Sequence, residues 1–538
     1  MASFNKLPAF NKLSTFNKLP TLNKLPTMTP LPDEIWHAIF SHFYCTIPNG
    51  HWSLIREDFD RRALRFLLDL SRVCRQFYSV VQRQLYCIII SGIRRDEHQR
   101  QVHLARSLVA HPELGLNVRW LTIDDIMWPS DVHFSNQLEE RIRSLNMPQT
   151  FQRLWNNAVP STDISTTPRD RNNLTTFILA LTPSVRLVDI SYSFPSKALS
   201  WLLGGSLGKR RGLPYPDSGE FFDDEYEQAA PFGNVAESYA NHLPNLVELH
   251  LRNPSYNSPM VASPPIADFR RALIHPNLRT LRVQGFHWLS LERETRVWAS
   301  FPIRIQCLEL ADAIIDAATI RHVLTICKDL RSLYITLGNA RKLGVGFNWE
   351  FDLTSIGNTL RERGRNLVEF GLQTDGFEVR GTCHGRIGSL QDMPGLKHLY
   401  ITKDNFVGVH GGEDMLMLHE SLPFSLETLC LYPEYRLSPE ADYPDVFQET
   451  NDEICGVQVG SDFPDLREIT IYRFCAEEKA KGGEFGCPVE GWKLVETETI
   501  VGSVEEPAEG SAEGSSIKRM VRLNSYLTRK PIHGARSV

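Results

Sequence analysis

The sequence predicts an α/β chain in which a small helical module precedes an irregular, strand-rich repeat solenoid, with disordered segments at both ends. Three observations lead to this prediction. Two apolar segments near the N-terminus have helical spacing, ten later segments share a strand-like template, and both ends of the chain have a biased composition. These features divide the chain into residues 1–28, 29–90, 100–480 and 500–538.

Low-complexity sequence marks the beginning of the chain. Residues 1–28 repeat a six-residue unit in which Leu-Pro pairs recur, as at Leu7-Pro8 and Leu19-Pro20. Proline at this spacing breaks a helix, and the pattern offers no sheet ladder, so we predict a disordered arm. At the other end, residues 500–538 are rich in Gly, Ser and Glu and then basic, which predicts a flexible tail.

Residues 29–90 contain two apolar segments with the spacing of amphipathic helices. In the first, residues 31–43, Pro32 suits the first helical turn, and the acidic residues after it match the positive end of the helix dipole. Apolar side chains recur three to four residues apart in this segment and in the second one, residues 64–86. Each segment would expose too much apolar surface as an isolated helix, so we predict that the two segments form a small helical module.

Residues 100–480 are dominated by short strand-like segments with one template: apolar, two variable, apolar, one variable, apolar. This is the template of the leucine-rich-repeat strand, in which three apolar side chains point into a solenoid core and the residues between them face solvent on the concave side. Ten segments carry it: VRWLTI (118–123), VRLVDI (185–190), LVELHL (246–251), LRTLRV (278–283), IQCLEL (305–310), LRSLYI (330–335), LVEFGL (367–372), LKHLYI (396–401), LETLCL (426–431) and LREITI (466–471).

Segments with helical spacing, such as residues 316–327 and 353–364, alternate with these strands and are predicted to form the convex layer. From Leu246 onward the starts of successive strand segments lie 25 to 40 residues apart. This spacing is longer and less regular than that of ordinary leucine-rich repeats. We therefore predict a horseshoe that carries insertions.

Composition and charge exclude several kinds of partner. The 58 Lys and Arg residues against 64 Asp and Glu residues leave a net charge of -6, which disfavours nucleic-acid binding. No stretch reaches the roughly 18 apolar residues of a membrane helix, so we expect no membrane partner. The ten cysteines lie apart, without CxxC pairs or His residues at metal-ligand spacing. We expect reduced thiols in a cytoplasmic or nuclear protein, with no metal or other cofactor.

One motif has the form of a catalytic site. Residues 204–208, GGSLG, match the G-x-S-x-G nucleophile elbow of serine hydrolases, which requires a strand before the serine and a helix after it. Here the preceding residues have helical character and the following ones read as a loop, so we interpret the match as a chance one. We predict no catalytic residue and no enzyme activity, and keep a hydrolase that uses Ser206 as a distant alternative.

The helical module contains a distinctive set of residues: Leu31-Pro32, Glu34-Ile35, Ile39-Phe40, Leu68, Leu70, Val73-Cys74-Arg75 and Phe77. With these residues it resembles the F-box, a three-helix module that docks onto a Skp-family adaptor. The sequence departs from that family by an insertion, residues 44–63, between its two helical segments. The resemblance implies an uncovered apolar face that receives a helix of the adaptor. The adaptor contacts that it implies are Leu31, Pro32, Ile35, Trp36, Ile39, Phe40, Leu68, Leu70, Val73 and Phe77.

The helical module, residues 104–124 and the repeats together are similar to fungal F-box proteins with irregular leucine-rich repeats. This resemblance implies the substrate-recognition subunit of a Skp–cullin–F-box ubiquitin ligase, which binds the adaptor, through it a cullin, and an unidentified protein substrate. Substrate contacts are expected on the concave side, where Tyr and Arg are frequent binding hot spots. The candidates are His250, Arg282, Glu309, Tyr334, Tyr400, Tyr432 and Tyr472. The alternative is a non-catalytic leucine-rich-repeat interaction scaffold outside a ubiquitin ligase.

Overall fold

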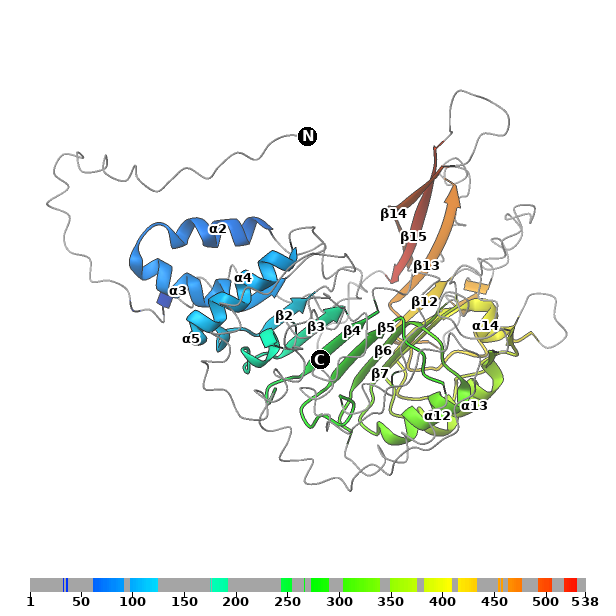
Figure 1. The fold of residues 1–538 in the computed structure, drawn as a ribbon. Helices are drawn as coiled ribbons and strands as arrows, with labels where there is room; N and C mark the ends of the chain where they lie inside the picture. Colours follow the sequence, from blue (N-terminus) through cyan, green and yellow to red (C-terminus); the bar gives the residue numbers. More distant parts are fainter. Residues whose placement is uncertain are drawn as a thin grey trace, which may run out of the picture. The chain divides into compact units, whose positions relative to one another are not determined.

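The computed structural model divides the chain into two compact units, Met1–Tyr86 and Cys87–Val538 (Figure 1). The predicted arm, residues 1–28, and most of the first predicted helix lie outside the residues that the structure describes. The described residues are 32, 35–36, 61–90, 97–123, 175, 177–191, 243–253, 266, 272–289, 303–338, 349–374, 382–408, 415–432, 453–454, 456–457, 463–476, 492–505 and 517–529.

The first unit is built on two helices, α2 (Arg61–Ser71) and α3 (Arg75–Leu85), which lie side by side (Figure 1). Their apolar stripes meet in a core formed by Leu67 of α2 and by Val80 and Val81 of α3. Each fully buried side chain of this size contributes about 1.5–3 kcal/mol to folding. The helical pairing therefore follows from the spacing of apolar residues in the sequence.

The two helices are separated by a turn at residues 72–74, so the apolar segment 64–86 does not form one continuous helix. The N–H of Val73 donates to the carbonyl of Leu70, which closes the last turn of α2. Cys74 then adopts an extended conformation, and its Sγ accepts a hydrogen bond from the N–H of Phe77 at 3.4 Å. A side chain that accepts from the third residue of a helix is an N-cap, so α3 starts anew here.

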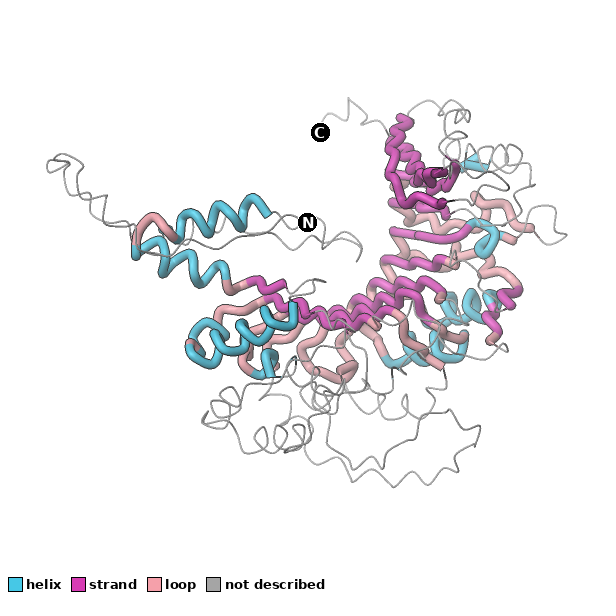
Figure 2. Tube along the Cα trace, turned by 45° about the horizontal axis from the view of Figure 1, so that its top comes forward, coloured by secondary structure: helices cyan, strands magenta, loops and turns pink. Residues whose placement is uncertain are grey.

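The second unit is built on one large sheet. Within the described residues this sheet has thirteen strands, of which β1 to β13 in sheet order are all parallel. Their order in the sheet follows the chain, and the strands trace a curve in Figure 2. They are β1 (Ile88–Ile90), β2 (Trp120–Ile123), β3 (Leu187–Ser191), β4 (Glu248–Arg252), β5 (Thr280–Gln284), β6 (Cys307–Ala313), β7 (Ser332–Leu337), β9 (Glu369–Gln373), β11 (His398–Thr402), β12 (Thr428–Tyr432) and β13 (Glu468–Ala476), followed by β15 (Ile517–Arg529) and β14 (Trp492–Glu505).

The template positions of neighbouring strands lie opposite each other. Leu249 of β4 pairs with Leu281 of β5, which in turn pairs with Leu308 of β6. The same apolar position is aligned in all ten template strands, from Leu121 of β2 to Ile469 of β13. The prediction of these ten strands is confirmed. Their register is fixed because a slip by one residue would move every apolar side chain to the other face of the sheet.

Helices cover the outer side of the curve (Figure 2). The predicted helical segments 316–327 and 353–364 correspond to α12 (Ala317–Ile326) and α13 (Leu353–Arg363). Each starts at an aspartate, Asp316 or Asp352, whose carboxylate accepts hydrogen bonds from backbone N–H groups of the first turn. The remaining described helices are α4 (Glu97–Ala110), α5 (Pro112–Gly115) and α14 (Lys403–Val407), and β8 (Glu350–Asp352) and β10 (Thr382–His384) form a small parallel sheet.

Two parts of the sheet differ from the prediction. Residues 88–90, which we assigned to the helical module, form β1 of the second unit, and a strand of three residues is too short to display the template. Residues 500–505 and 517–529, expected to be flexible tail, belong to β14 and β15, which pair antiparallel with each other, and β15 pairs with β13. Positions 517, 521, 523 and 527 are apolar and alternate with other residues, a strand signal that the Gly-, Ser- and Glu-rich composition obscured.

Candidate functional site

The face of the sheet opposite its apolar core carries polar side chains in regular rows. On β4, for example, Leu249 and Leu251 are buried in the core, while Glu248, His250 and Arg252 alternate with them and point to the other side. We call this side the polar face. Its central row is the one that the template predicted, and strand pairing places its members opposite one another: Thr122, Asp189, His250, Arg282, Glu309, Tyr334, Gly371, Tyr400, Cys430 and Thr470.

Several members of the central row are buried, although the sequence predicted that they face solvent. His250 is 1% exposed and Asp189 is 7% exposed, whereas Arg282, Glu309, Tyr334 and Tyr400 are half-buried. Neighbouring strands lie only about 4.8 Å apart, so large side chains on adjacent strands cover one another. The polar face is therefore a layer of interacting side chains with limited access to solvent.

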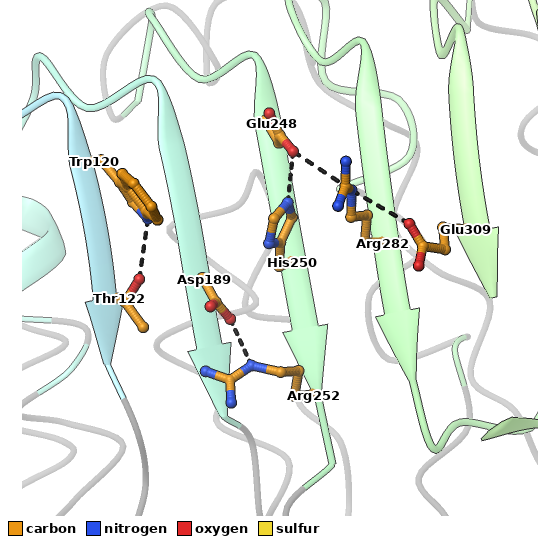
Figure 3. A network of polar contacts seen from close by, with 8 residues as sticks. All are labelled: Trp120, Thr122, Asp189, Glu248, His250, Arg252, Arg282 and Glu309. Atoms are coloured by element: carbon orange, nitrogen blue, oxygen red, sulfur yellow. Dashed lines mark hydrogen bonds and ion pairs between the residues drawn. The ribbon is translucent and has the colours of Figure 1, made fainter. Parts of the chain in front are cut away.

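The centre of this layer, on β4 to β6, is a chain of charged contacts (Figure 3). Nε2 of His250 lies 2.6 Å from Oε1 of Glu248, and Nε of Arg282 lies 3.5 Å from the same oxygen and 3.4 Å from Oε2 of Glu309. Burial raises the pKa of the Glu248 carboxyl, but the hydrogen bond with His250 and the attraction of His250 and Arg282 more than offset this and lower its pKa. Glu248 is thus held as a carboxylate by its partners.

A second ion pair lies beside this chain, toward β3. Nε of Arg252 is 2.6 Å from Oδ1 of Asp189, and both side chains are largely buried. Farther along, the indole Nε1 of Trp120 donates to Oγ1 of Thr122 at 3.0 Å (Figure 3). On β3 to β6 the carboxylates are therefore paired with arginines of the same chain, which favours a structural role for this part of the polar face.

On β7 to β11 the polar face carries two tyrosines and a glutamate that accepts hydrogen bonds from hydroxyl groups. The rings of Tyr334 and Tyr400 lie with their centroids 5.4 Å apart, and the Tyr334 hydroxyl donates to Oε2 of Glu369 at 3.0 Å. Ser332 Oγ donates to the same oxygen at 2.8 Å. Burial raises the pKa of the Tyr334 hydroxyl, and the neighbouring Tyr400 and Glu369 add to this, so the hydroxyl stays protonated and remains a donor.

The other two tyrosines predicted to contact substrate lie beside the central row. Tyr432 is the last residue of β12, is half-buried and is aligned with Thr402 of β11. Tyr472 belongs to β13, but its side chain lies outside the part of the chain that the structure describes. The structure thus brings five of the seven candidates into one row and places Tyr432 in the neighbouring row.

The helical unit divides the predicted adaptor residues into two sets. Ile35, Leu68 and Val73 are 45%, 41% and 66% exposed, and Pro32 is exposed as well. Trp36, Leu70 and Phe77 instead pack against the core of Leu67, Val80 and Val81. The Trp36 and Phe77 rings meet edge to face, with centroids 4.6 Å apart, so their first role is to hold the unit together. Leu31, Ile39 and Phe40 lie outside the described residues.

Two exposed aromatic residues of the helical unit were not among the predicted contacts. Phe66 of α2 is 43% exposed and Tyr78 of α3 is 52% exposed. Apolar spacing alone did not single them out, because which face of a helix is buried depends on how its partner helix packs.

The serine-hydrolase motif, residues 204–208 with Ser206, lies outside the residues that the structure describes. No group of three His, Cys, Asp or Glu side chains within the described ranges is placed to hold a metal ion, and no described helix is both long and apolar enough to cross a membrane. Comparison with protein-family models gave no match, and comparison with curated proteins gave none either.

Proposed function

We propose that this chain is the substrate-recognition subunit of a Skp–cullin–F-box ubiquitin ligase. In this proposal the helical unit is an F-box module that binds a Skp-family adaptor. The second unit is a leucine-rich-repeat solenoid of horseshoe form, and its polar face binds a protein substrate. The chain itself carries out no chemistry. It holds the substrate close to a ubiquitin-loaded enzyme, and proximity supplies the gain in rate.

The observation that carries the proposal is the apolar surface that the helical unit leaves uncovered. Val73, at the turn between α2 and α3, is 66% exposed, and Leu68 on α2 is 41% exposed. Both belong to the residues that match the F-box pattern. Covering an aliphatic side chain of this size stabilises a complex by up to about 1.5–3 kcal/mol. A partner helix laid over these residues would gain that free energy.

The receptor part of the proposal is supported by the arrangement of the parallel sheet. Strands follow one another in chain order, with helices on the outer side (Figure 2). Polar side chains such as His250 and Arg252 lie on the other face. Stacked repeats of this kind create extended binding surfaces. The polar face also combines charged residues with tyrosines such as Tyr334 and Tyr400, the kind of surface that proteins use for contact with other proteins.

The adaptor contact is tested by Val73→Glu in the full chain. A glutamate at this turn is tolerated in the free protein because the side chain is exposed, but it would be buried without a partner under an adaptor helix. We expect co-purification with a Skp-family adaptor to be lost, with an affinity at least about tenfold lower by titration calorimetry. Circular dichroism and the melting temperature should remain those of the wild type.

The matched control is Val247→Glu, which makes the same change at another exposed valine, 39% exposed, next to β4 of the sheet. This variant should bind the adaptor like the wild type. Undiminished adaptor binding by Val73→Glu would argue against the F-box assignment. The scaffold alternative predicts that the wild type captures no adaptor, and that deleting residues 31–86 leaves the turnover of its partners unchanged.

A further inference from the structure

The two tyrosines of the central row meet because the strand between them carries a glycine. Tyr334 of β7, Gly371 of β9 and Tyr400 of β11 are aligned by strand pairing. Two strands that flank a third strand lie about 9.6 Å apart. A side chain on the strand between them normally keeps their side chains from touching. Here the ring centroids are 5.4 Å apart, with the ring planes inclined by 59°. The rings therefore form one aromatic surface across three strands.

Gly371 is required for this arrangement. A Cβ atom at this position would lie 2.4 Å from Cδ1 and 3.0 Å from Cε1 of Tyr334, well inside van der Waals contact. The ring of Tyr334 thus occupies the space that a side chain on β9 would fill. Any residue other than glycine would separate the two tyrosines.

A carboxylate that forms no ion pair with any other described residue adjoins the tyrosine pair. Glu369, two residues before Gly371, accepts hydrogen bonds from Ser332 Oγ and Tyr334 Oη, both of which are neutral donors. His398 is opposite Glu369 on β11, yet no ion pair joins these two described residues. This differs from β3 to β6, where Arg252 and Arg282 pair with the carboxylates. Within the described residues, the contacts of Glu369 therefore leave its negative charge without a cationic partner.

Three basic residues lie just before the first residues of strands near Glu369, but the structure shows no ion pair between them and Glu369. Arg331, Lys397 and Arg467 precede β7, β11 and β13, and all three are exposed. Lys397 forms an ion pair with Glu427, the residue before β12, with Nζ 2.6 Å from Oε1. Salt screens exposed charges beyond about 8–10 Å, and it screens half-buried charges such as Glu369 less. Besides burial, the negative charge of Glu369 raises the pKa of both tyrosine hydroxyls, and Glu468 adds to this at Tyr400.

We propose that Tyr334, Tyr400 and Glu369 form a subsite for a basic side chain, Lys or Arg, of the protein substrate. The cationic group would lie against the aromatic rings, whose faces attract cations, and bind the carboxylate of Glu369. This inference rests on the proposed substrate-receptor function and specifies the chemistry that its polar face recognises. An acidic side chain is disfavoured at the same place because it would approach Glu369 and the electron-rich ring faces.

The test begins with selection of a random dodecapeptide display library on the full-length chain. Peptides that bind should be enriched in Lys or Arg at one position relative to the input library. The best peptide is then synthesised with a fluorophore, together with a version in which that basic residue is replaced by norleucine. Anisotropy titrations should show that the replacement weakens binding to the wild type about tenfold.

The assignment to Glu369 is tested with Glu369→Gln, which keeps the shape and the hydrogen-bond acceptor but removes the charge. With this variant the replacement by norleucine should change the affinity less than about twofold, and Tyr400→Leu should behave similarly. Glu350→Gln, the same change at an exposed glutamate of β8, is the matched control and should keep the full effect.

Three results would overturn the subsite: no enriched peptide, enrichment of acidic or uncharged peptides, or a norleucine effect that is equally large in Glu369→Gln. Peptide binding needs no adaptor, so it is measured independently of the Val73→Glu experiment. If one of these three results is found while adaptor binding is intact, only the inference about the subsite is refuted. Selection of basic peptides by a chain that binds no adaptor would refute only the ligase function.

Discussion

Gly371→Ala is the change for which the structure makes the sharpest energetic prediction. The new Cβ would lie 2.4 Å from Cδ1 of Tyr334, about 1 Å closer than ordinary contact, so the tyrosine ring must move. Overpacking of this kind costs about 1–3 kcal/mol. The cost includes the weakened hydrogen bond from Tyr334 to Glu369 and the weakened contact with Tyr400.

Gly371→Ala should stabilise the protein, instead of destabilising it, when the ring of Tyr334 has been removed. In a Tyr334→Ala background the atoms nearest the new Cβ are absent, because all three of them belong to Tyr334. Alanine in a strand is then favoured over glycine by roughly 0.5–1 kcal/mol, since it loses less backbone entropy on folding. The coupling free energy between positions 334 and 371 should therefore be roughly 1.5–4 kcal/mol.

Native-state hydrogen exchange, followed by mass spectrometry on peptides from β7, β9 and β11, measures these free energies locally. This is preferable to a global denaturation curve because a chain with two compact units need not unfold in one step. Gly371→Ala should speed exchange in these strands in the wild type and slow it in Tyr334→Ala. An equal effect in both backgrounds, or stabilisation of the wild type, would refute the packing of Tyr334 over Gly371.

Two further predictions concern titration and accessibility. His275 is 3% exposed, and burial lowers its pKa from 6.5 to about 4. Between these two pH values the unfolded chain binds a proton at His275 that the folded chain does not bind. The free energy of unfolding should therefore fall by about 2 kcal/mol from pH 7 to pH 5. Melting temperatures at the two pH values should show this loss, and His275→Asn should remove most of it; an unchanged pH slope in the variant would contradict the argument. Cys74 is exposed next to Val73, whereas Cys327 is buried and burial raises its pKa to about 12. A bound Skp-family adaptor should slow alkylation of Cys74 by iodoacetamide about tenfold or more, with Cys327 unreactive throughout, as read by peptide mass spectrometry; an unchanged Cys74 rate would place the adaptor elsewhere.

The sequence was sufficient to predict most of the sheet. Ten segments with the same apolar template form ten strands, and their apolar positions are aligned from Leu121 to Ile469. The reason is that each strand must bury the same positions against one continuous core, so periodicity specifies both the strand and its register. The helices α12 and α13 follow from the same logic at helical spacing.

The sequence was not sufficient where a strand lacks the template or where composition misleads. β1 has only three residues, and its partner is the template strand β2. Residues 500–505 of β14 and all of β15 lie where a Gly-, Ser- and Glu-rich composition predicted a flexible tail. In both cases the segment forms hydrogen bonds with a neighbouring strand, and these bonds cannot be predicted from the sequence of the segment itself.

Local periodicity was thus enough to predict the ten template strands and which of their residues share a row. How accessible those residues are and what they contact depends on the packing of the whole fold. It buries His250 under its neighbours, brings Tyr334 and Tyr400 together over Gly371, and leaves Glu369 with neutral partners. Packing also places Trp36 against the core of the helical unit while leaving Val73 exposed. These outcomes depend on side chains that are distant in sequence and meet only when strands and helices pack, so no local pattern encodes them.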